Sequence, residues 1–222
     1  MDKNFADVRR EYGELQCNEV DMNLNPIEQF KLWFADIQKT ETLDPTAMIL
    51  STVDNKGRPD ARTLLLKDID LDKFVFYTNY KSAKAQQLAN NAEVALTFFW
   101  PALGRQVRVR GTVSFTSKEE SDEYFYSRPL AYQVSAIVSP QSHEIQSREE
   151  LQRALDSLMQ QEDIKHVRPE HWGGYKVTPY EIEFMQARNN RLHDRIRFLS
   201  IPSCRCYHID CMISILVCFR SL

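Results

Sequence analysis

The stretch Gln106-Val107-Arg108-Val109-Arg110-Gly111-Thr112-Val113-Ser114-Phe115 alternates polar and apolar residues along its whole length. Successive side chains of a β-strand point to opposite faces of a sheet, so a period of two residues is typical of a strand that is buried on one side only. This stretch therefore predicts a half-buried strand, and shorter segments of strand character lie on both sides of it.

The flanking strands are expected to be short and separated by turn residues. The turn Asp54-Asn55-Lys56-Gly57 follows the first of them, and Pro101 ends the one that precedes residues 106–115. Besides 106–115, the expected strands are residues 48–53, 61–67, 73–78, 94–100, 174–177, 181–186 and 193–198.

Four helices are expected from their capping residues. Asn25 is a suitable N-cap, Pro26 suits the first helical position, and apolar residues then recur on one helical face. Ser82 can cap a short helix that runs through residue 91. Capping boxes at residues 117–120 and 147–150 predict two further helices, which end near residues 127 and 161.

These elements predict one antiparallel, barrel-like α+β domain. The domain is expected to span residues 25–198, since no internal repeat or low-complexity linker interrupts them. The polar residues 1–24 are interpreted as a mobile N-terminal arm. Residues 199–222 are interpreted as an atypical, cysteine-rich tail of unknown structure.

The composition excludes several classes of protein. A net charge of −3 argues against nucleic acid as the main partner, because nucleic-acid-binding domains usually carry a basic excess. No apolar run approaches the roughly 20 residues that cross a bilayer. The first seven residues lack the apolar core of a signal peptide, so a cytoplasmic location is expected.

Four of the five cysteines lie near the end of the chain, at positions 204, 206, 211 and 218. A metal site made by Cys204, Cys206 and Cys211 with His208 is conceivable. These spacings match no common zinc pattern, however, so no metal site is predicted.

Cationic residues recur on the expected strands and culminate in Arg191-Leu192-His193-Asp194-Arg195. A charge that points into a protein is costly unless it is paired. In a chain that is not basic overall, the recurrence indicates sites for bound anions, with phosphate the obvious candidate. Any single one of these cations can instead face solvent, so the indication comes from the set.

Taken in order, several stretches resemble the pyridoxine (pyridoxamine) 5′-phosphate oxidase family. The resemblance runs from Arg9 to about Phe198. Its stretches are Arg9-Arg10-Glu11-Tyr12, Asp44-Pro45-Thr46-Ala47-Met48, residues 62–67, Phe76-Tyr77-Thr78-Asn79, Tyr124-Phe125-Tyr126-Ser127-Arg128-Pro129, Gln141-Ser142, Trp172-Gly173-Gly174 and residues 191–195. It implies a flavin-binding split β-barrel with peripheral helices, working as a homodimer with flavin mononucleotide (FMN) at the subunit interface.

The resemblance also implies roles for residues that match the family. Arg62 and Lys84 would hold the FMN phosphate, and Gln106, Gln141 and Ser142 would donate or accept hydrogen bonds with the cofactor. Arg195 would lie close to the flavin ring, where a fixed positive charge stabilises the reduced anion. The full set of implied cofactor-binding residues is Arg62, Thr63, Leu64, Leu65, Leu66, Lys67, Tyr77, Thr78, Lys84, Gln106, Gln141, Ser142 and Arg195.

Substrate contacts are implied in the same way. Lys67, Tyr124 and Arg128 would hold the substrate phosphate. Arg191 and His193 are the implied catalytic residues and would straddle the pyridine ring. They lie two residues apart on an expected extended segment, so both side chains can face the same side. Arg9, Arg10 and Tyr12 would belong to an arm that closes over the pocket.

The implied reaction belongs to vitamin B6 metabolism. A hydride would pass from C4′ of pyridoxine or pyridoxamine 5′-phosphate to N5 of FMN, and dioxygen would then reoxidise the flavin to give hydrogen peroxide. The product would be pyridoxal 5′-phosphate, with ammonia released from the amine.

The chain departs from the family pattern at several positions. Ala83 stands where a second cation is usual, Met185 where a Trp is usual, and Tyr132 where a small hydroxyl residue is usual. These departures leave two alternatives open. One is a diverged, weakly active or inactive paralogue that carries FMN or pyridoxal phosphate, and the other is a split-barrel flavoprotein with a different substrate.

Overall fold

The structure is a computed structural model, which describes residues 15–160, 167–201 and 206–213. Its helices are α1 (Pro26–Ile37), α2 (Ala83–Asn90), α3 (Lys118–Ser127), α4 (Leu130–Val138) and α5 (Arg148–Met159). Its strands are β1 (Ala47–Val53), β2 (Pro59–Leu65), β3 (Asp68–Asp70), β4 (Lys73–Asn79), β5 (Glu93–Trp100), β6 (Arg105–Phe115), β7 (Trp172–Gln186), β8 (Asp194–Ile201) and β9 (Cys206–Ile213).

The described strands form one sheet in the order β2-β1-β5-β6-β7-β4-β3, with β8 paired to β7 and β9 paired to β8. The pairs β3–β4, β4–β7, β7–β8 and β8–β9 are antiparallel. Residues 106–115, where polar and apolar residues alternate, form β6 together with Arg105. Through the first half of β6 the residues alternate between buried and more exposed positions. Both the α+β class and the antiparallel arrangement of these pairs therefore agree with the prediction.

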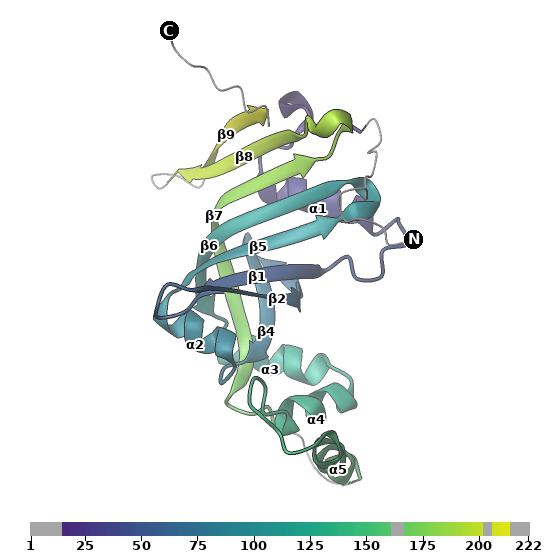
Figure 1. The fold of residues 1–222 in the computed structure, drawn as a ribbon, viewed down its shortest axis with the longest axis vertical. Coiled ribbons are helices and arrows are strands. Elements are labelled where there is room, and N and C mark those ends of the chain that lie inside the picture. Colours follow the sequence, from purple (N-terminus) through teal and green to yellow (C-terminus); the bar gives the residue numbers. More distant parts are fainter. Residues whose placement is uncertain (1–14, 161–166, 202–205, 214–222) are drawn as a thin grey trace, which may run out of the picture. The chain divides into compact units, whose positions relative to one another are not determined.

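Strand β7 replaces two predicted strands with one. Residues 172–177 pair with β4, and residues 181–186 pair with β8 (Figure 1). Pro179 lies between these two paired parts and has no N–H to donate. The prediction of separate strands at 174–177 and 181–186 was wrong, because the proline marks a change of partner and does not end the strand.

The chain divides into two compact units, and β7 contributes to both. Unit 1 contains Met1–Ile49, Ala95–Arg110 and Pro179–Leu222, and unit 2 contains Leu50–Val94 and Gly111–Thr178. The unit boundaries fall within strands, at positions other than the expected domain limits at residues 25 and 198.

Helix α1 supplies much of the aromatic core of unit 1. The Asn25 side chain accepts a hydrogen bond from the Ile27 N–H at 2.9 Å, as the predicted N-cap requires. The Phe30 ring packs edge-on against Phe98 at a centroid distance of 4.9 Å, and Trp33 packs in the same way against Phe184 at 5.1 Å. The predicted apolar face of the helix is therefore the face that meets the sheet.

Unit 2 is built around an aromatic stack. The rings of Tyr77 and Tyr124 stack at a centroid distance of 4.0 Å, and Trp172 stacks on Tyr77 at 5.5 Å. The predicted capping box of α3 is confirmed in both of its hydrogen bonds, between Ser117 and Glu120. This helix thereby brings Tyr124 from α3 to the strand that carries Tyr77.

Helix α4 was not predicted. Its N-cap is Pro129, which offers no side-chain cap, and its sequence carries no capping signal. Val134 and Ala136 are buried, so packing within unit 2 stabilises a helix that its local sequence does not announce.

The sheet continues beyond residue 198, where the expected domain ended. Strand β9 pairs with β8 in an antiparallel register that runs from Asp194 opposite Ile213 to Ile201 opposite Cys206 (Figure 1). Arg197 and Asp210 face each other in this register and form an ion pair at 2.7 Å. Part of the predicted cysteine-rich tail is therefore a strand, since the ladder needs only backbone N–H and C=O groups.

The described part of the expected N-terminal arm, residues 15–24, is attached to unit 1. Cys17 and Met22 are buried, and the Cys17 N–H donates to an Asp194 carboxylate oxygen at 3.0 Å. The rest of the expected arm, with Arg9, Arg10 and Tyr12, lies outside the described residues.

No helix among the described residues is long and apolar enough to cross a membrane. No group of three or more His, Cys, Asp or Glu side chains in that part of the chain is arranged to hold a metal ion. Cys204, which the conceivable metal site needed, lies outside the described residues.

A pair of substitutions on α1 tests the packing of unit 1. Phe30 is 1% exposed and Leu32, on the same helix, is 56% exposed. We expect Phe30→Ala to lower the free energy of unfolding by about 3–5 kcal/mol, because it leaves a cavity beside Phe98. Leu32→Ala should change it by about 0.5 kcal/mol or less. Urea denaturation of both variants measures this, and equal losses would show that the helix does not pack on the sheet through Phe30.

Candidate functional site

Lys84, in the first turn of α2, is a buried cation without a carboxylate partner. It is 6% exposed, and its ammonium donates to Thr78 Oγ1 and to Gln141 Oε1, both at 3.2 Å. Burial, followed by the nearby charge of Arg62, lowers the pKa of Lys84. No described carboxylate forms an ion pair with it. A bound anion would therefore compensate a charge that the protein itself leaves unbalanced.

Arg62 is held in place by groups from β1 and α2. Its guanidinium donates to Thr52 Oγ1 at 2.6 Å and to Gln87 Oε1 at 3.1 Å, and it forms an ion pair with Asp60. Thr52, Gln87 and Asp60 were not among the predicted site residues. The sequence signals only one of the three, because Thr52 is a polar residue within an expected strand, where the structure shows it to be buried.

Ser82, directly before α2, carries a buried hydroxyl that no described group pairs. Its side chain is fully buried, and it does not cap the helix although its position is that of the N-cap. The free N–H groups of a helix N-terminus also favour an anion. Ser82 and Lys84 therefore lie two residues apart at one helix end, and both have hydrogen-bonding capacity that a phosphate would use.

A pocket of about 640 Å³ in unit 2 contains most of the predicted residues of that unit. Predicted cofactor residues and predicted substrate residues line it together. Those that line it are Leu64, Leu65, Lys67, Tyr77, Thr78, Tyr124, Arg128 and Gln141. Thr78 and Gln141 connect it to the Lys84 ammonium through the hydrogen bonds described above.

Three hydrogen-bond donors in this pocket lack partners among the described residues. The Arg128 guanidinium lies 4.7 Å from the centroid of the Trp172 ring, and its buried Nη1 makes no hydrogen bond. Burial is also the main reason that the pKa of Arg128 is lowered. The Lys67 ammonium and the Tyr124 hydroxyl bond to no described group, and both residues line this pocket with Arg128. Two cations and a phenol with free donors fit a phosphate dianion.

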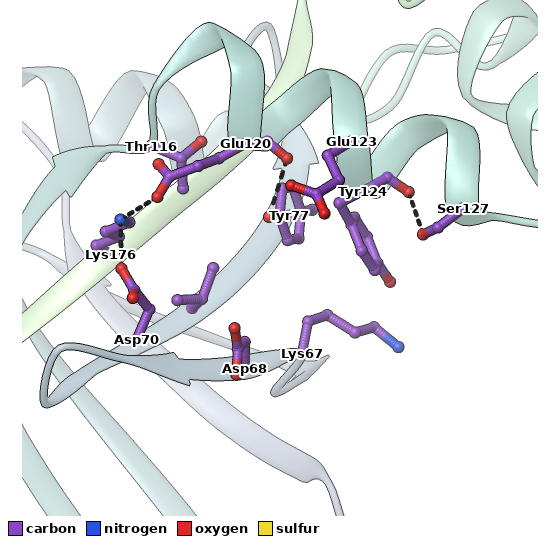
Figure 2. A pocket seen from close by; sticks show the side chains of 11 residues that line it. Lys67, Asp68, Asp70, Tyr77, Thr116, Glu120, Glu123, Tyr124, Ser127 and Lys176 are labelled. Carbon is purple, nitrogen blue, oxygen red and sulfur yellow. Dashed lines mark hydrogen bonds and ion pairs between the residues drawn. The ribbon is translucent and has the colours of Figure 1, made fainter.

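An adjoining pocket of about 390 Å³ shares Lys67, Tyr77 and Tyr124 but has a different charge. Figure 2 shows Lys176 between Asp70, at 2.6 Å, and Glu120, at 2.5 Å. The Lys176 ammonium is the largest cause of the lowered pKa of Glu120. Because these carboxylates already neutralise Lys176, an anion is favoured on the side of Lys67 that faces Arg128.

Unit 1 holds a separate cluster around a buried carboxylate. Glu183 on β7 is 5% exposed and accepts from Arg195 at 2.7 Å and from Arg108 at 3.4 Å. Met185 lies directly opposite Arg195 in the β7–β8 register. Glu183 was not predicted, although a glutamate between Ile182 and Phe184 in an apolar strand is a signal for a buried ion pair. The guanidinium of Arg195 therefore has a fixed position.

The loop before β8 differs from its expected conformation. Asn190 and Arg191 have φ values of 56° and 60°, and Arg191 ends a short 3-10 helix. The expectation that residues 191–193 are extended was wrong, because the chain turns at these two residues in the left-handed region. His193 follows the turn, and burial, then the charges of Arg195 and Arg191, lower the pKa of its imidazole.

The remaining predicted residues are not brought into the 640 Å³ pocket. Gln106 is half-buried on β6 in unit 1, and its side chain makes no hydrogen bond to a described residue. Ser142 is exposed and has a φ of 67°. Thr63 is exposed and Leu66 is buried, and neither lines the pocket.

Comparison with protein families matches two models to the chain. Residues 36–161 match the model described as pyridoxamine 5′-phosphate oxidase. Residues 172–204 match the model described as the pyridoxine 5′-phosphate oxidase C-terminal dimerisation region. Together they cover β1 to β8 and most of the residues discussed above.

Curated relatives named pyridoxine/pyridoxamine 5′-phosphate oxidase are similar over almost the whole chain. The protein of Legionella pneumophila (strain Paris) is 57% identical over 197 residues, which are 88% of this chain and 92% of the relative. The protein of Gloeothece citriformis is 50% identical with the same coverage.

Two solved structures have a similar fold. PhzG from Burkholderia lata, in complex with tetrahydrophenazine-1-carboxylic acid, matches with a TM-score of 0.84 and 25% identity, over 90% of this chain and 98% of that one. An FMN-binding protein from Nostoc punctiforme, related to pyridoxamine 5′-phosphate oxidase, matches with a TM-score of 0.71 and 16% identity, over 86% and 99%. The predicted split β-barrel fold is confirmed.

A glutamate pair on β7 tests the cluster around Glu183. We expect Glu183→Gln to lower the free energy of unfolding by about 1.5–3 kcal/mol, because Arg195 and Arg108 lose a charged acceptor. Glu181→Gln is the matched control, since Glu181 pairs with Arg110 on the same two strands but the pair is more exposed. Its loss should stay below about 1 kcal/mol. Urea denaturation of the FMN-free chain compares the two, and a control loss as large as that of Glu183→Gln would contradict the special role of the buried carboxylate.

Proposed function

Because the chain belongs to the pyridoxamine 5′-phosphate oxidase family, we propose that it oxidises pyridoxine 5′-phosphate or pyridoxamine 5′-phosphate with FMN as cofactor and dioxygen as acceptor. The observation that carries this proposal is the pocket in which Lys67, Tyr124 and Arg128 present unpaired donors beside the Lys84 cluster. The site thus offers two separate places for phosphate, as a phosphorylated substrate and a phosphorylated cofactor together require.

FMN would be held through its phosphate by Arg62 and Lys84. The fit rests on the buried ammonium of Lys84, which has only neutral partners, and on the unpaired hydroxyl of Ser82. The Lys84 ammonium and the Ser82 hydroxyl at the start of α2 suit a phosphate dianion, and Arg62 on β2 adds a second cation that is already paired with Asp60. Ala83 adds no further charge there, so affinity depends on these few groups.

The substrate phosphate would be held by Lys67, Tyr124 and Arg128. The Arg128 guanidinium lies over the Trp172 ring, and this contact limits the movement of the guanidinium. Its Nη1 has no partner and can donate to the phosphate. In the adjoining pocket, Asp70 and Glu120 repel a phosphate and so favour binding on the Arg128 side. This arrangement orients the substrate by its phosphate before the ring is positioned.

The proposed reaction removes two electrons from C4′ of the substrate. When bound, FMN would supply the hydride acceptor, and its reoxidation by dioxygen with two protons would give hydrogen peroxide. The alcohol loses its hydroxyl proton and becomes the aldehyde, whereas the amine gives an imine that water converts to the aldehyde and ammonia. Arg195, fixed by Glu183, would contribute a positive charge near the flavin, and Arg191 and His193 would position the pyridine ring.

A homodimer is proposed from the C-terminal part of the chain. Residues 172–204, which include β7 and β8, match the family's dimerisation region. The Gln106 side chain makes no hydrogen bond to a described residue. In a dimer, this side chain would contact the cofactor that the other copy holds.

The alternative is a chain that binds FMN or pyridoxal 5′-phosphate without turning substrate over. Tyr132 favours it, because this large side chain lines the same pocket as Arg128 and occupies space there. PhzG, which has a similar fold, binds tetrahydrophenazine-1-carboxylic acid, so this fold can hold a molecule other than a vitamin B6 phosphate. Binding of either phosphate compound without product formation would favour this alternative.

The decisive experiment is aerobic turnover of pyridoxine 5′-phosphate by the purified chain in excess FMN. We expect one aldehyde and one hydrogen peroxide per substrate consumed. Arg128→Met should raise the KM by about 10–100-fold, as expected for the loss of a charged hydrogen bond. Unphosphorylated pyridoxine, assayed in parallel, should be a poor substrate whose kinetics do not respond to the substitution. Equal effects on both compounds would contradict phosphate binding by Arg128, and absence of turnover by the folded chain would contradict the oxidase.

Lys84→Met should separate stability from cofactor binding. Because burial lowers the pKa of Lys84, its charged form destabilises the FMN-free protein, and methionine removes that cost. The gain in unfolding free energy should be full below the lowered pKa and disappear as the pH rises to the ordinary value of lysine. FMN affinity should fall by about 10–100-fold.

Thermal denaturation across pH and flavin fluorescence titration measure the two effects of Lys84→Met. Lys81→Met is the control, since Lys81 is an exposed lysine between β4 and α2, three residues before Lys84. Unchanged FMN affinity in Lys84→Met would remove Lys84 from the phosphate site.

A further inference from the structure

His193 receives a hydrogen bond that decides which of its ring nitrogens carries a proton. The backbone N–H of Arg188 donates to His193 Nδ1 at 3.0 Å. An N–H group can donate only to a nitrogen with a free lone pair, so Nδ1 is unprotonated in this arrangement. In the neutral ring the proton is therefore on Nε2. A doubly protonated ring would place two N–H groups against each other.

A second contact holds Arg188 in the position from which it donates. The Arg188 guanidinium donates from Nη1 to both oxygens of Asp194, at 3.2 and 3.3 Å. Arg188 thus donates a hydrogen bond to His193 from its backbone N–H and hydrogen bonds to Asp194 from its side chain. The two bonds close a short loop around the left-handed residues Asn190 and Arg191, which would otherwise be costly to keep.

Asp194 also connects this loop to the N-terminal segment. The Oδ2 atom that accepts from Arg188 accepts from the Cys17 N–H at 3.0 Å as well. Cys17 is buried and belongs to the N-terminal segment, so the Asp194 carboxylate has one partner within the loop and one outside it. The contact with Cys17 therefore helps to hold Asp194, and through Asp194 it helps to hold Arg188.

We propose that Arg188 is a positioning residue that holds His193 as the neutral tautomer protonated on Nε2, with Asp194 as the anchor of Arg188. This inference rests on the proposed function for its consequence in catalysis. In this tautomer the only N–H of the ring is on Nε2, so His193 is a hydrogen-bond donor at Nε2 and not a base there. Such a donor suits an oxygen acceptor, such as a phosphate oxygen or the oxygen of the hydroxyl group on the pyridine ring.

Burial and the charges of Arg195 and Arg191 also favour the neutral imidazole of His193. Arg191 and Arg195 disfavour a positive ring, Asp194 favours it, and burial is the largest effect, so the pKa of His193 lies below its ordinary value. Arg188 adds a further positive charge that Asp194 neutralises. The neutral ring is therefore favoured, and in the neutral ring the tautomer determines which nitrogen can donate.

Nitrogen NMR of the FMN-loaded full chain, labelled in its histidines, tests the proposal directly. In the wild type we expect His193 to show an unprotonated Nδ1 and a protonated Nε2 at neutral pH. Arg188→Ala keeps the backbone N–H but loses the anchor, so both tautomers should be populated and the titration midpoint of His193 should rise by about one pH unit. Arg188→Lys, which retains a cation for Asp194, should restore most of the wild-type spectrum.

Asp194→Asn is the second variant and should also mix the tautomers, in case Arg188→Ala fails to fold. Arg58→Ala is the matched control, because it removes an arginine–aspartate ion pair with Asp54 in a turn of unit 2. A wild-type ring protonated on Nδ1, or a tautomer that is unchanged in both Arg188→Ala and Asp194→Asn, would overturn the proposal. The NMR readout does not need turnover, so an inactive chain with the expected spectrum would contradict the proposed function and leave this inference standing.

Discussion

The structure depends on the fifteen-residue strand β7, which changes its partner within one continuous chain. Its first part pairs with β4 and its second part with β8. The first part carries Trp172, which supports Arg128, and the second part carries Glu183, which fixes Arg195. A single strand therefore sets the supporting residues of both clusters, and a shift of its register by one residue would turn each of them to the wrong face.

The groups proposed to bind phosphate lower the stability of the ligand-free protein. Lys84 is buried with neutral hydrogen-bond partners only, Arg128 has a buried Nη1 without a partner, and Ser82 adds a buried hydroxyl without a partner. Each such group costs free energy in the ligand-free state. Glu183 shows the opposite solution, because its carboxylate is shared by two guanidinium groups. The difference between these two kinds of buried charge separates groups that wait for a ligand from groups that hold other groups in place.

Local signals in the sequence predicted the elements whose stability is local. The N-cap Asn25 and the capping box of Ser117 and Glu120 gave α1 and α3, because both caps are contacts within a few residues. Helix α4 has no such signal and is stabilised by packing, so it was not predicted. The same limit applies to the site: Lys67, Tyr124 and Arg128 came from a family resemblance, whereas the partnership of Glu183 with Arg195 needs a register that no local pattern contains.

Strand β9 is attached to the sheet mainly through its backbone. Its pairing with β8 uses main-chain groups over its whole length, and the cross-strand pair of Arg197 and Asp210 is partly exposed. Such a strand requires an extended segment of suitable length without proline, and little else of its side chains. Insertions, frameshifts or exchanged terminal segments can therefore be accepted at this edge while the sheet that carries the binding residues keeps its register.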